Sequence, residues 1–184
     1  MRYGLQGERR GPERIESLNR ELCFEKRNIV LIGMPGCGKT TLGALLSSAL
    51  GRPLRDTDVE IEARAGMPIA ELFRRYGEAR VRELECGLLR EVCATGGAVV
   101  ATGGGAVLRQ ENVDAMKKNG TVVFLDRPPQ SLLPSDERPL ADNPEKISAL
   151  FRARYPIYTA AADLTLPVRG TPEQSLKELL EILI

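Results

Sequence analysis

Short apolar runs alternate with longer amphipathic segments along most of the chain. Five runs have the length and branched side chains of buried strands, and they cover residues 29–32, 53–56, 98–102, 121–126 and 164–168. Between them, apolar residues recur at intervals of three and four in six segments that we expect to be helical, residues 41–50, 59–65, 69–93, 111–118, 145–162 and 172–184. Gly77 interrupts the longest segment, which predicts a kink or two helices there. Strands that alternate with helices predict a parallel sheet covered on both faces.

Two segments lack this pattern. Residues 1–26 are charged and poor in apolar side chains, and we interpret them as an N-terminal extension or linker that precedes a domain of residues 27–184. Residues 127–144 contain five prolines and several charges, a composition typical of a lid over an active site.

The first apolar run leads into the most informative stretch of the sequence. Residues 33–40 fit the pattern Gly-x-x-x-x-Gly-Lys-Thr, and a predicted helix follows, which is the strand–loop–helix context of a P-loop. Glycines let the backbone N–H groups turn inward toward phosphate, and the start of the helix adds further donors. The pattern predicts a nucleotide-binding set of Gly36, Cys37, Gly38, Lys39, Thr40 and Thr41. We expect Lys39 to contact the β- and γ-phosphates and Thr40 to bind Mg²⁺. The predicted fold is a three-layer α/β P-loop NTPase fold of the nucleoside monophosphate kinase-like type, with a five-stranded parallel sheet.

Composition limits the chemistry that this loop can serve. The 184 residues include no histidine, so acid–base work must come from Asp, Glu, Lys, Tyr or Cys. The formal net charge of +1 gives no field for nucleic acid, and no apolar run approaches the ~20 residues of a membrane span. The N-terminus lacks the apolar core of a secretory signal, so we expect a cytoplasmic protein. Two interpretations of Cys37 stay open, a small residue that fills a loop position or a reactive thiol beside Lys39.

Two aspartates compete for the role of magnesium ligand. Asp126 ends the apolar run 121–126, and Asp56 ends the run 53–56. We favour Asp56, because the second strand commonly neighbours the P-loop strand, and we expect it to reach the metal through water. Asp58 stands two residues further on, so in an extended chain both carboxylates project to one side. One can organise Mg²⁺ while the other accepts the proton of a substrate hydroxyl.

Other residues suit an acceptor that carries a carboxylate. Arg82 and Arg154 are planar, bidentate donors, and the glycines at 103–105 offer bare backbone for close approach. Read in order, the chain resembles the shikimate kinase family over about residues 28–182. The segments that carry the resemblance are residues 33–40, 56–58, 69–73, 77–78, 82–85, 102–105, 138–140 and 154–158.

This resemblance implies ATP-dependent phosphorylation of the 3-hydroxyl of shikimate, which yields shikimate 3-phosphate and ADP on the route to aromatic amino acids. It implies that Asp58 contacts the acceptor hydroxyls and acts as base, and that Lys39 and Arg138 act on the phosphates, with Arg138 descending from the lid. The implied acceptor site consists of Asp58, Arg82, Gly103, Gly104, Gly105 and Arg154, with Phe73 and Glu85 nearby. Shikimate and ATP are then the partners, Mg²⁺ the cofactor, and the protein a monomer.

Several alternatives remain open. Arg82 and Glu78 have the spacing of an ordinary ion pair on a helix surface, and Arg154 has an alternative as a solvated surface residue. The glycines at 103–105 have an alternative interpretation in which they form a tight turn and contact no ligand. Val81 stands where the family usually has an aromatic residue, which predicts a roomier acceptor pocket. The competing functions are a gluconate-type kinase and a module that senses its ligand without turnover.

Overall fold

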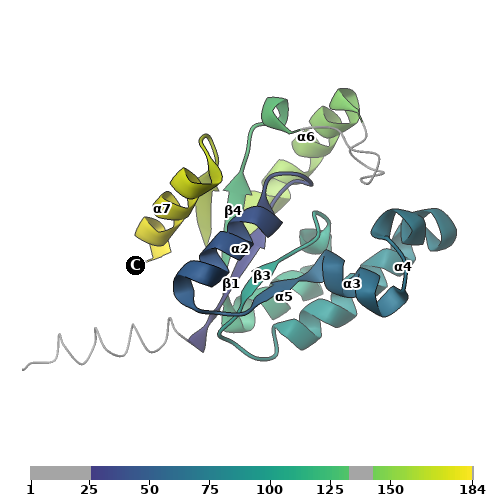
Figure 1. Ribbon diagram of the computed structural model, residues 1–184. Helices are drawn as coiled ribbons and strands as arrows, with labels where there is room; N and C mark the ends of the chain where they lie inside the picture. Colours follow the sequence, from purple (N-terminus) through teal and green to yellow (C-terminus); the bar gives the residue numbers. More distant parts are fainter. Residues whose placement is uncertain (1–25, 133–142, 184) are drawn as a thin grey trace, which may run out of the picture.

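The computed structural model describes residues 26–132 and 143–183, and these form one layered α/β unit (Figure 1). Five strands pair in parallel in the order β2-β3-β1-β4-β5. Their bounds are β1 (Asn28–Ile32), β2 (Leu54–Asp56), β3 (Val99–Ala101), β4 (Gly120–Asp126) and β5 (Leu164–Pro167). The predicted five-stranded parallel sheet is confirmed, and each strand lies within two residues of its expected position.

Helices cover both faces of this sheet, as the alternating pattern predicted. They are α2 (Lys39–Leu50), α3 (Thr57–Ala65), α4 (Ile69–Val92), α5 (Gln110–Asn119), α6 (Pro144–Ala161) and α7 (Pro172–Leu183), with short 3-10 helices η1 (Ala106–Leu108) and η2 (Pro129–Ser131). Helices α2 and α7 pack on each other and on one face, while α5 and α6 pack on β4 from the other face. None of the helices in the described ranges is long and apolar enough to cross a membrane.

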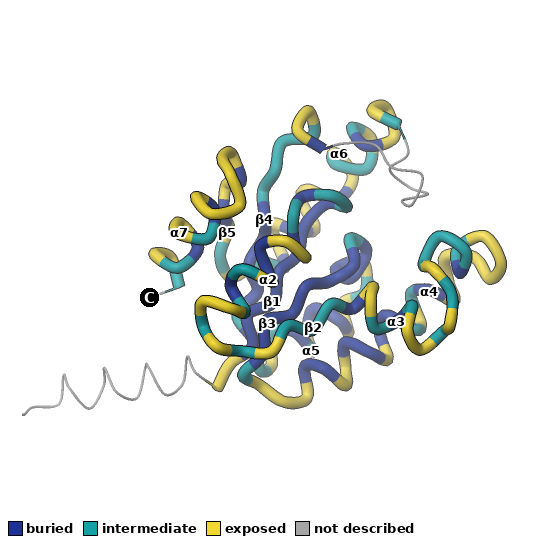
Figure 2. The backbone as a smooth tube through the Cα atoms, in the orientation of Figure 1, coloured by how far each residue is buried: buried dark blue, intermediate teal, exposed yellow. Residues whose placement is uncertain are grey.

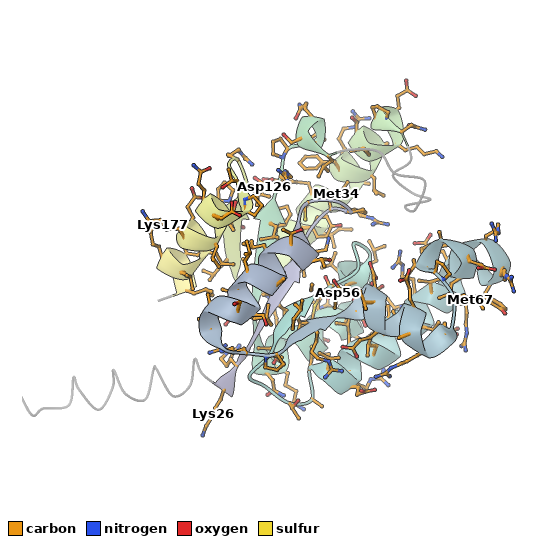
Figure 3. All side chains as sticks on the ribbon, in the orientation of Figure 1. Lys26, Met34, Asp56, Met67, Asp126 and Lys177 are labelled. Carbon is orange, nitrogen blue, oxygen red and sulfur yellow. The ribbon has the colours of Figure 1, made fainter. Side chains whose placement is uncertain are left out.

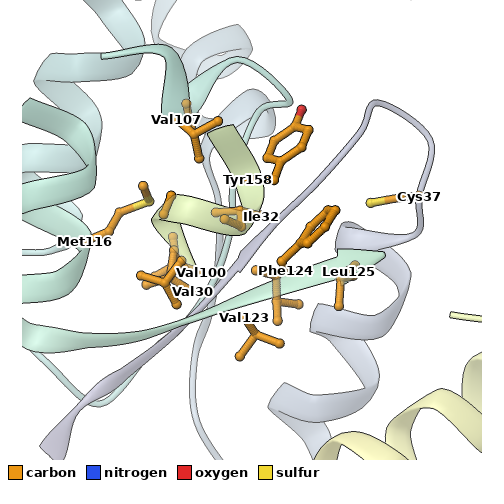
Figure 4. Close-up of a cluster of buried hydrophobic side chains, with 14 of the residues drawn as sticks. Val30, Ile32, Cys37, Val100, Val107, Met116, Val123, Phe124, Leu125 and Tyr158 are labelled. Carbon is orange, nitrogen blue, oxygen red and sulfur yellow. The ribbon is translucent and has the colours of Figure 1, made fainter. Parts of the chain in front are cut away.

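The core lies along the central strands. All five residues of β1 and all three of β3 are buried, because a central strand in a covered parallel sheet has both faces against helices. Figure 2 shows this dark central sheet with the exposed residues on the outer helix faces. The edge strand β2 is only half-buried. Close to the carboxyl end of β4, Phe124 packs with Tyr158 of α6 (Figure 4).

The expected position of the second strand is wrong. Strand β2 pairs with β3, which lies between β2 and the P-loop strand β1. The reason is that α2 crosses β3 on its way from β1 to β2 and packs on all three strands. The argument that favoured Asp56 by adjacency therefore fails, although the residue still ends its strand at the carboxyl edge of the sheet.

Helix α3 starts earlier than predicted, and this changes the geometry of the aspartates. It begins at Thr57 because the side chain of Asp56 caps it and accepts hydrogen bonds from the N–H groups of Asp58 and Val59. Asp58 thus lies in the first helical turn, so the expectation of an extended Asp56–Asp58 segment is wrong. The predicted break in the long helix is confirmed at Gly77, whose φ of 77° and ψ of 170° are not helical.

Two predicted features fall largely or wholly outside the described residues. The N-terminal extension lies there apart from Lys26, and so does most of the proposed lid, including Arg138.

Candidate active site

A cavity of about 750 Å³ opens at the carboxyl edge of the sheet. Its walls come from the P-loop, the start of α3, helix α4, the segment after β3 and helix α6. Figure 3 shows Met34 and Asp56 toward this edge, with Lys26 at the opposite end of the sheet. Nearly all the predicted site residues in the described ranges line it, namely Gly36, Gly38, Lys39, Thr40, Thr41, Asp56, Asp58, Arg82, Gly103, Gly104, Gly105 and Arg154.

The P-loop has the backbone that its glycines predict. Gly33, Gly36 and Gly38 have φ values of 146°, 78° and 104°, which favour glycine over other residues. The buried ammonium of Lys39 donates to the carbonyl oxygens of Gly33 at 3.0 Å and Met34 at 2.9 Å. These bonds hold the positive charge across the mouth of the loop, at the place where phosphate oxygens would bind.

The hydroxyl of Thr40 and the carboxylate of Asp56 meet beside this loop. Thr40 Oγ1 donates to Asp56 Oδ2 at 2.7 Å, while Asp56 Oδ1 caps α3. Two hard oxygen ligands at the edge of a phosphate cradle suit Mg²⁺, which usually takes its other ligands from phosphate and water. The described residues contain no group of three acidic, Cys or His side chains that could hold a metal ion.

The competing aspartate is engaged elsewhere. Asp126 ends β4, which pairs directly with the P-loop strand, but its Oδ2 lies 3.3 Å from Arg169 Nη2. Its backbone carbonyl also accepts a hydrogen bond from the same guanidinium. Asp126 is not among the residues that line the main cavity, so the geometry favours Asp56.

Asp58 faces the cavity from the first turn of α3. The side chain is open to the cavity, while protein atoms surround it on the other sides, and this burial raises the pKa of its carboxyl. Lys39 and Arg82 act in the opposite direction, and the negative charge of Asp56 adds to the rise. Asp58 therefore combines exposure to a substrate with a carboxyl more basic than usual, which suits a general base.

Arg82 lines the cavity from helix α4 and makes two ion pairs. It contacts Glu85 at 2.7 Å and Glu78 at 3.1 Å, and its guanidinium lies 5.5 Å from the ring centre of Phe73. The predicted ion pair with Glu78 is therefore present. It is not an ordinary surface pair, because only 11% of the Arg82 side chain is exposed. Burial disfavours the charge on Arg82, but Glu85 and Glu78 outweigh it and hold its pKa above the ordinary value. Burial likewise raises the pKa of Glu85, against the effect of Arg82.

Arg154 is buried, so the interpretation as a solvated surface residue is wrong. It is 5% exposed, and its Nη1 donates to the carbonyl oxygen of Gly104 at 3.1 Å. Arg154 and Arg82 thus line one cavity from α6 and α4. Two guanidinium groups that line one cavity are suited to an anionic ligand.

The three glycines after β3 are needed for close approach. They do form a turn, in which the N–H group of Ala106 donates to the Gly103 carbonyl at 3.2 Å, but none of the three glycines has a positive φ, so the turn itself does not require glycine. A Cβ on Gly103 would lie 2.7 Å from Asp58 Oδ1, and one on Gly104 would lie 2.8 Å from the ring of Pro35. A Cβ on Gly105 would collide with the guanidinium of Arg82. This segment is therefore bare backbone between Pro35 of the P-loop and the side chains of Asp58 and Arg82.

Arg127 is a site residue that the sequence reasoning missed. It follows β4 directly and lines both the main cavity and a smaller one of about 70 Å³ beside the P-loop. Its Nε is buried without a hydrogen-bond partner among the described residues. The available signal was its position, since an arginine directly after a predicted strand of a parallel sheet lies at the ligand-binding edge.

Cys37 is packed into the loop. Only 1% of the residue is exposed, and its Sγ lies 3.7 Å from Lys39 Nζ. The Sγ is also so close to Gly33 that a Cβ added to that glycine would lie 2.9 Å from it. This environment favours the interpretation as a small residue that fills the loop.

A P-loop shares one cavity with Asp58, Arg82 and Arg154 at the carboxyl edge of a parallel sheet, and this arrangement is typical of a P-loop kinase that acts on a small molecule. The family model described as shikimate kinase matches residues 35–184. The chain belongs to the shikimate kinase family.

Individual relatives agree with this assignment. A shikimate kinase from Clostridium botulinum is 38% identical over 163 residues, which cover 86% of this chain and 98% of the relative. The solved structure of the shikimate kinase from Acinetobacter baumannii in complex with shikimate has a TM-score of 0.82 at 33% identity, and the match covers 89% of this chain and 96% of that one. A gluconokinase from Sinorhizobium meliloti has a TM-score of 0.51 at 17% identity, which shows a shared fold alone.

Proposed function

We propose that this protein transfers the γ-phosphoryl group of ATP to the 3-hydroxyl of shikimate, which yields shikimate 3-phosphate and ADP. Membership of the family supports the reaction class. The observation that carries the choice of acceptor is the pair of guanidinium groups, Arg82 and Arg154, in the same cavity as Asp58. A cyclic acid with several hydroxyls needs such a combination of cationic forks for its carboxylate and a carboxylate for its hydroxyls.

In the nucleotide half, backbone N–H groups of the P-loop would bind the phosphates, with Gly36, Cys37, Gly38 and Thr41 supplying the cradle. Lys39 would exchange its bonds to the loop carbonyls for phosphate oxygens as ATP enters. Thr40 and Asp56 would hold Mg²⁺, Asp56 through water, and the ion supplies charge neutralisation on the β- and γ-phosphates when bound.

In the acceptor half, Asp58 would accept the proton of the attacking hydroxyl. Burial of Asp58 raises its pKa, which makes its carboxylate a better proton acceptor. Arg82 and Arg154 would bind the substrate carboxylate in bidentate fashion, with Gly103, Gly104 and Gly105 against the ring. Glu85 holds Arg82 in its orientation toward the cavity.

Arg138 would contact the phosphates from a lid of residues 127–144 and exclude water during transfer. We also propose that the enzyme is monomeric and cytoplasmic.

A coupled assay of ADP release tests this proposal. With ATP, Mg²⁺ and shikimate we expect turnover by the wild-type protein and loss of at least two orders of magnitude in Asp58→Asn, the scale of general base catalysis, ~10²–10⁴-fold. Turnover with gluconate in place of shikimate would assign the protein to the competing kinase class. Binding of both ligands without ADP release would identify a sensing module and refute the proposal.

A further inference from the structure

Two side chains of α6 converge on one backbone carbonyl in the wall of the cavity. The carbonyl oxygen of Gly104 accepts a hydrogen bond from Arg154 Nη1 at 3.1 Å and another from the Tyr158 hydroxyl at 2.5 Å. Arg154 and Tyr158 are four residues apart, so they share one face of the helix. The proposed chemistry uses Arg154 but gives Tyr158 no role.

The ring of Tyr158 packs in the hydrophobic core. The residue is 1% exposed, and its ring stacks on that of Phe124, with ring centres 5.2 Å apart and planes 17° apart. Phe124 belongs to β4 and pairs in register with Ile32, the last residue of β1 before the P-loop. Figure 4 shows the two rings together, with the Tyr158 hydroxyl pointing away from the core. Burial raises the pKa of the phenol, so it stays a hydrogen-bond donor at physiological pH.

The other side of Gly104 faces the P-loop. A Cβ on this residue would lie 2.8 Å from two ring carbons of Pro35, so the backbone is in tight contact with the loop. Gly104 is thereby placed between the phosphate-binding loop and the acceptor-binding helix α6. A displacement of its carbonyl would change the distance between the two halves of the site, and phosphoryl transfer depends strongly on that distance.

We propose that Tyr158 is a positioning residue for phosphoryl transfer, which fixes the Gly103–Gly105 wall between the P-loop and the acceptor. The inference rests on the proposed function. Arg154 is also proposed to bind the carboxylate of the acceptor with its planar fork, whereas the Tyr158 hydroxyl has no proposed ligand. When the guanidinium turns to the substrate, Tyr158 keeps the Gly104 carbonyl in place. Tyr158 then also limits the positions from which Arg154 can bind.

The test compares Tyr158→Phe with Tyr155→Phe. The first change removes the hydroxyl and keeps the ring that stacks on Phe124. The second removes a hydroxyl from the same helix, at a residue that is 38% exposed and also contacts Phe124. Amide hydrogen exchange over residues 103–106 reports the restraint without any substrate. Steady-state kinetics with ATP, Mg²⁺ and shikimate, well below the melting temperature, report its effect on transfer.

We expect exchange about tenfold faster over residues 103–106 in Tyr158→Phe than in Tyr155→Phe. We also expect a kcat about tenfold lower, with the KM for ATP within about twofold of wild type, because misplacement affects the reacting geometry more than the binding of ATP. A tyrosine that only stabilises the fold would lower the melting temperature and leave kcat unchanged.

Two results would overturn the inference: equal exchange in the two variants, or faster exchange with a wild-type kcat. A wild-type protein that fails to phosphorylate shikimate would refute the proposed function instead. In that case the exchange comparison still decides whether Tyr158 restrains the wall, and the role in transfer to shikimate is withdrawn.

Discussion

Gly104→Ala would place a methyl group where the ring of Pro35 lies. The added Cβ would be 2.8 Å from two ring carbons of Pro35, while non-bonded carbon atoms prefer about 3.5 to 4.0 Å. Either the P-loop or the glycine segment must therefore move by roughly 0.7 to 1.2 Å. Overpacking of this kind costs about 1–3 kcal/mol of stability. A displacement of about 1 Å in an active site can cost on the order of 100-fold in rate.

We therefore expect Gly104→Ala to lower kcat/KM for shikimate by about 100-fold and to lower the melting temperature by about 2 to 4 °C for each kcal/mol lost. The matched control is Gly87→Ala in helix α4, where an added Cβ meets no atom within 4 Å. Alanine in a helix is favoured over glycine by about 0.5–1 kcal/mol, so this control should be equally or more stable and fully active. Wild-type kcat/KM in Gly104→Ala, measured by ADP release and compared with the control, would refute the close-approach argument.

Two further predictions concern the aspartates. Asp56→Asn keeps the cap of α3 but weakens the proposed metal ligand, so the Mg²⁺ concentration for half-maximal activity should rise while the melting temperature changes little. Asp56→Ala removes the cap as well, so it should also lose about 1 kcal/mol of stability. An unchanged Mg²⁺ titration in Asp56→Asn would contradict its role. Burial raises the pKa of Asp58, so its ionised form opposes folding above that pKa. Asp58→Asn should therefore melt at a higher temperature than wild type at pH 7, and the difference should vanish below about pH 4, where both side chains are neutral. A lower melting temperature for Asp58→Asn than for wild type at pH 7 would contradict the raised pKa of Asp58.

The phosphate-binding half of the site could be predicted from local sequence. Residues 33–40 adopt the expected loop because glycines with positive φ and a following helix are local requirements that the pattern records. The same holds for the break at Gly77. The order of the strands could not be predicted in this way, because apolar periodicity identifies strands but does not say which ones pair. The placement of β2 beyond β3 depends on the path of α2 over the sheet.

The acceptor half shows a second limit of sequence reasoning. Arg82 and Arg154 were singled out by the chemistry of their side chains, and the resemblance to a family then gave them a place in the site. Arg127 lay in the predicted lid, and Tyr158, although it belongs to the segment 154–158 that carries the resemblance, was given no role. Tyr158 is apolar in pattern and packs in the core, and only the position of its hydroxyl 2.5 Å from the Gly104 carbonyl relates it to the site. Such a contact joins residues 54 positions apart, and no local pattern records it.

The groups of this site carry structural tasks along with their proposed chemical ones. Asp56 caps α3 while it accepts from Thr40, and Lys39 ties the loop carbonyls together. Arg154 donates to the Gly104 carbonyl while it lines the cavity. Truncation to alanine at such positions removes both tasks at once, so a loss of activity alone cannot assign a chemical role. Variants that keep one task and remove the other, such as Asp56→Asn or Tyr158→Phe, separate the two because stability and rate then change independently.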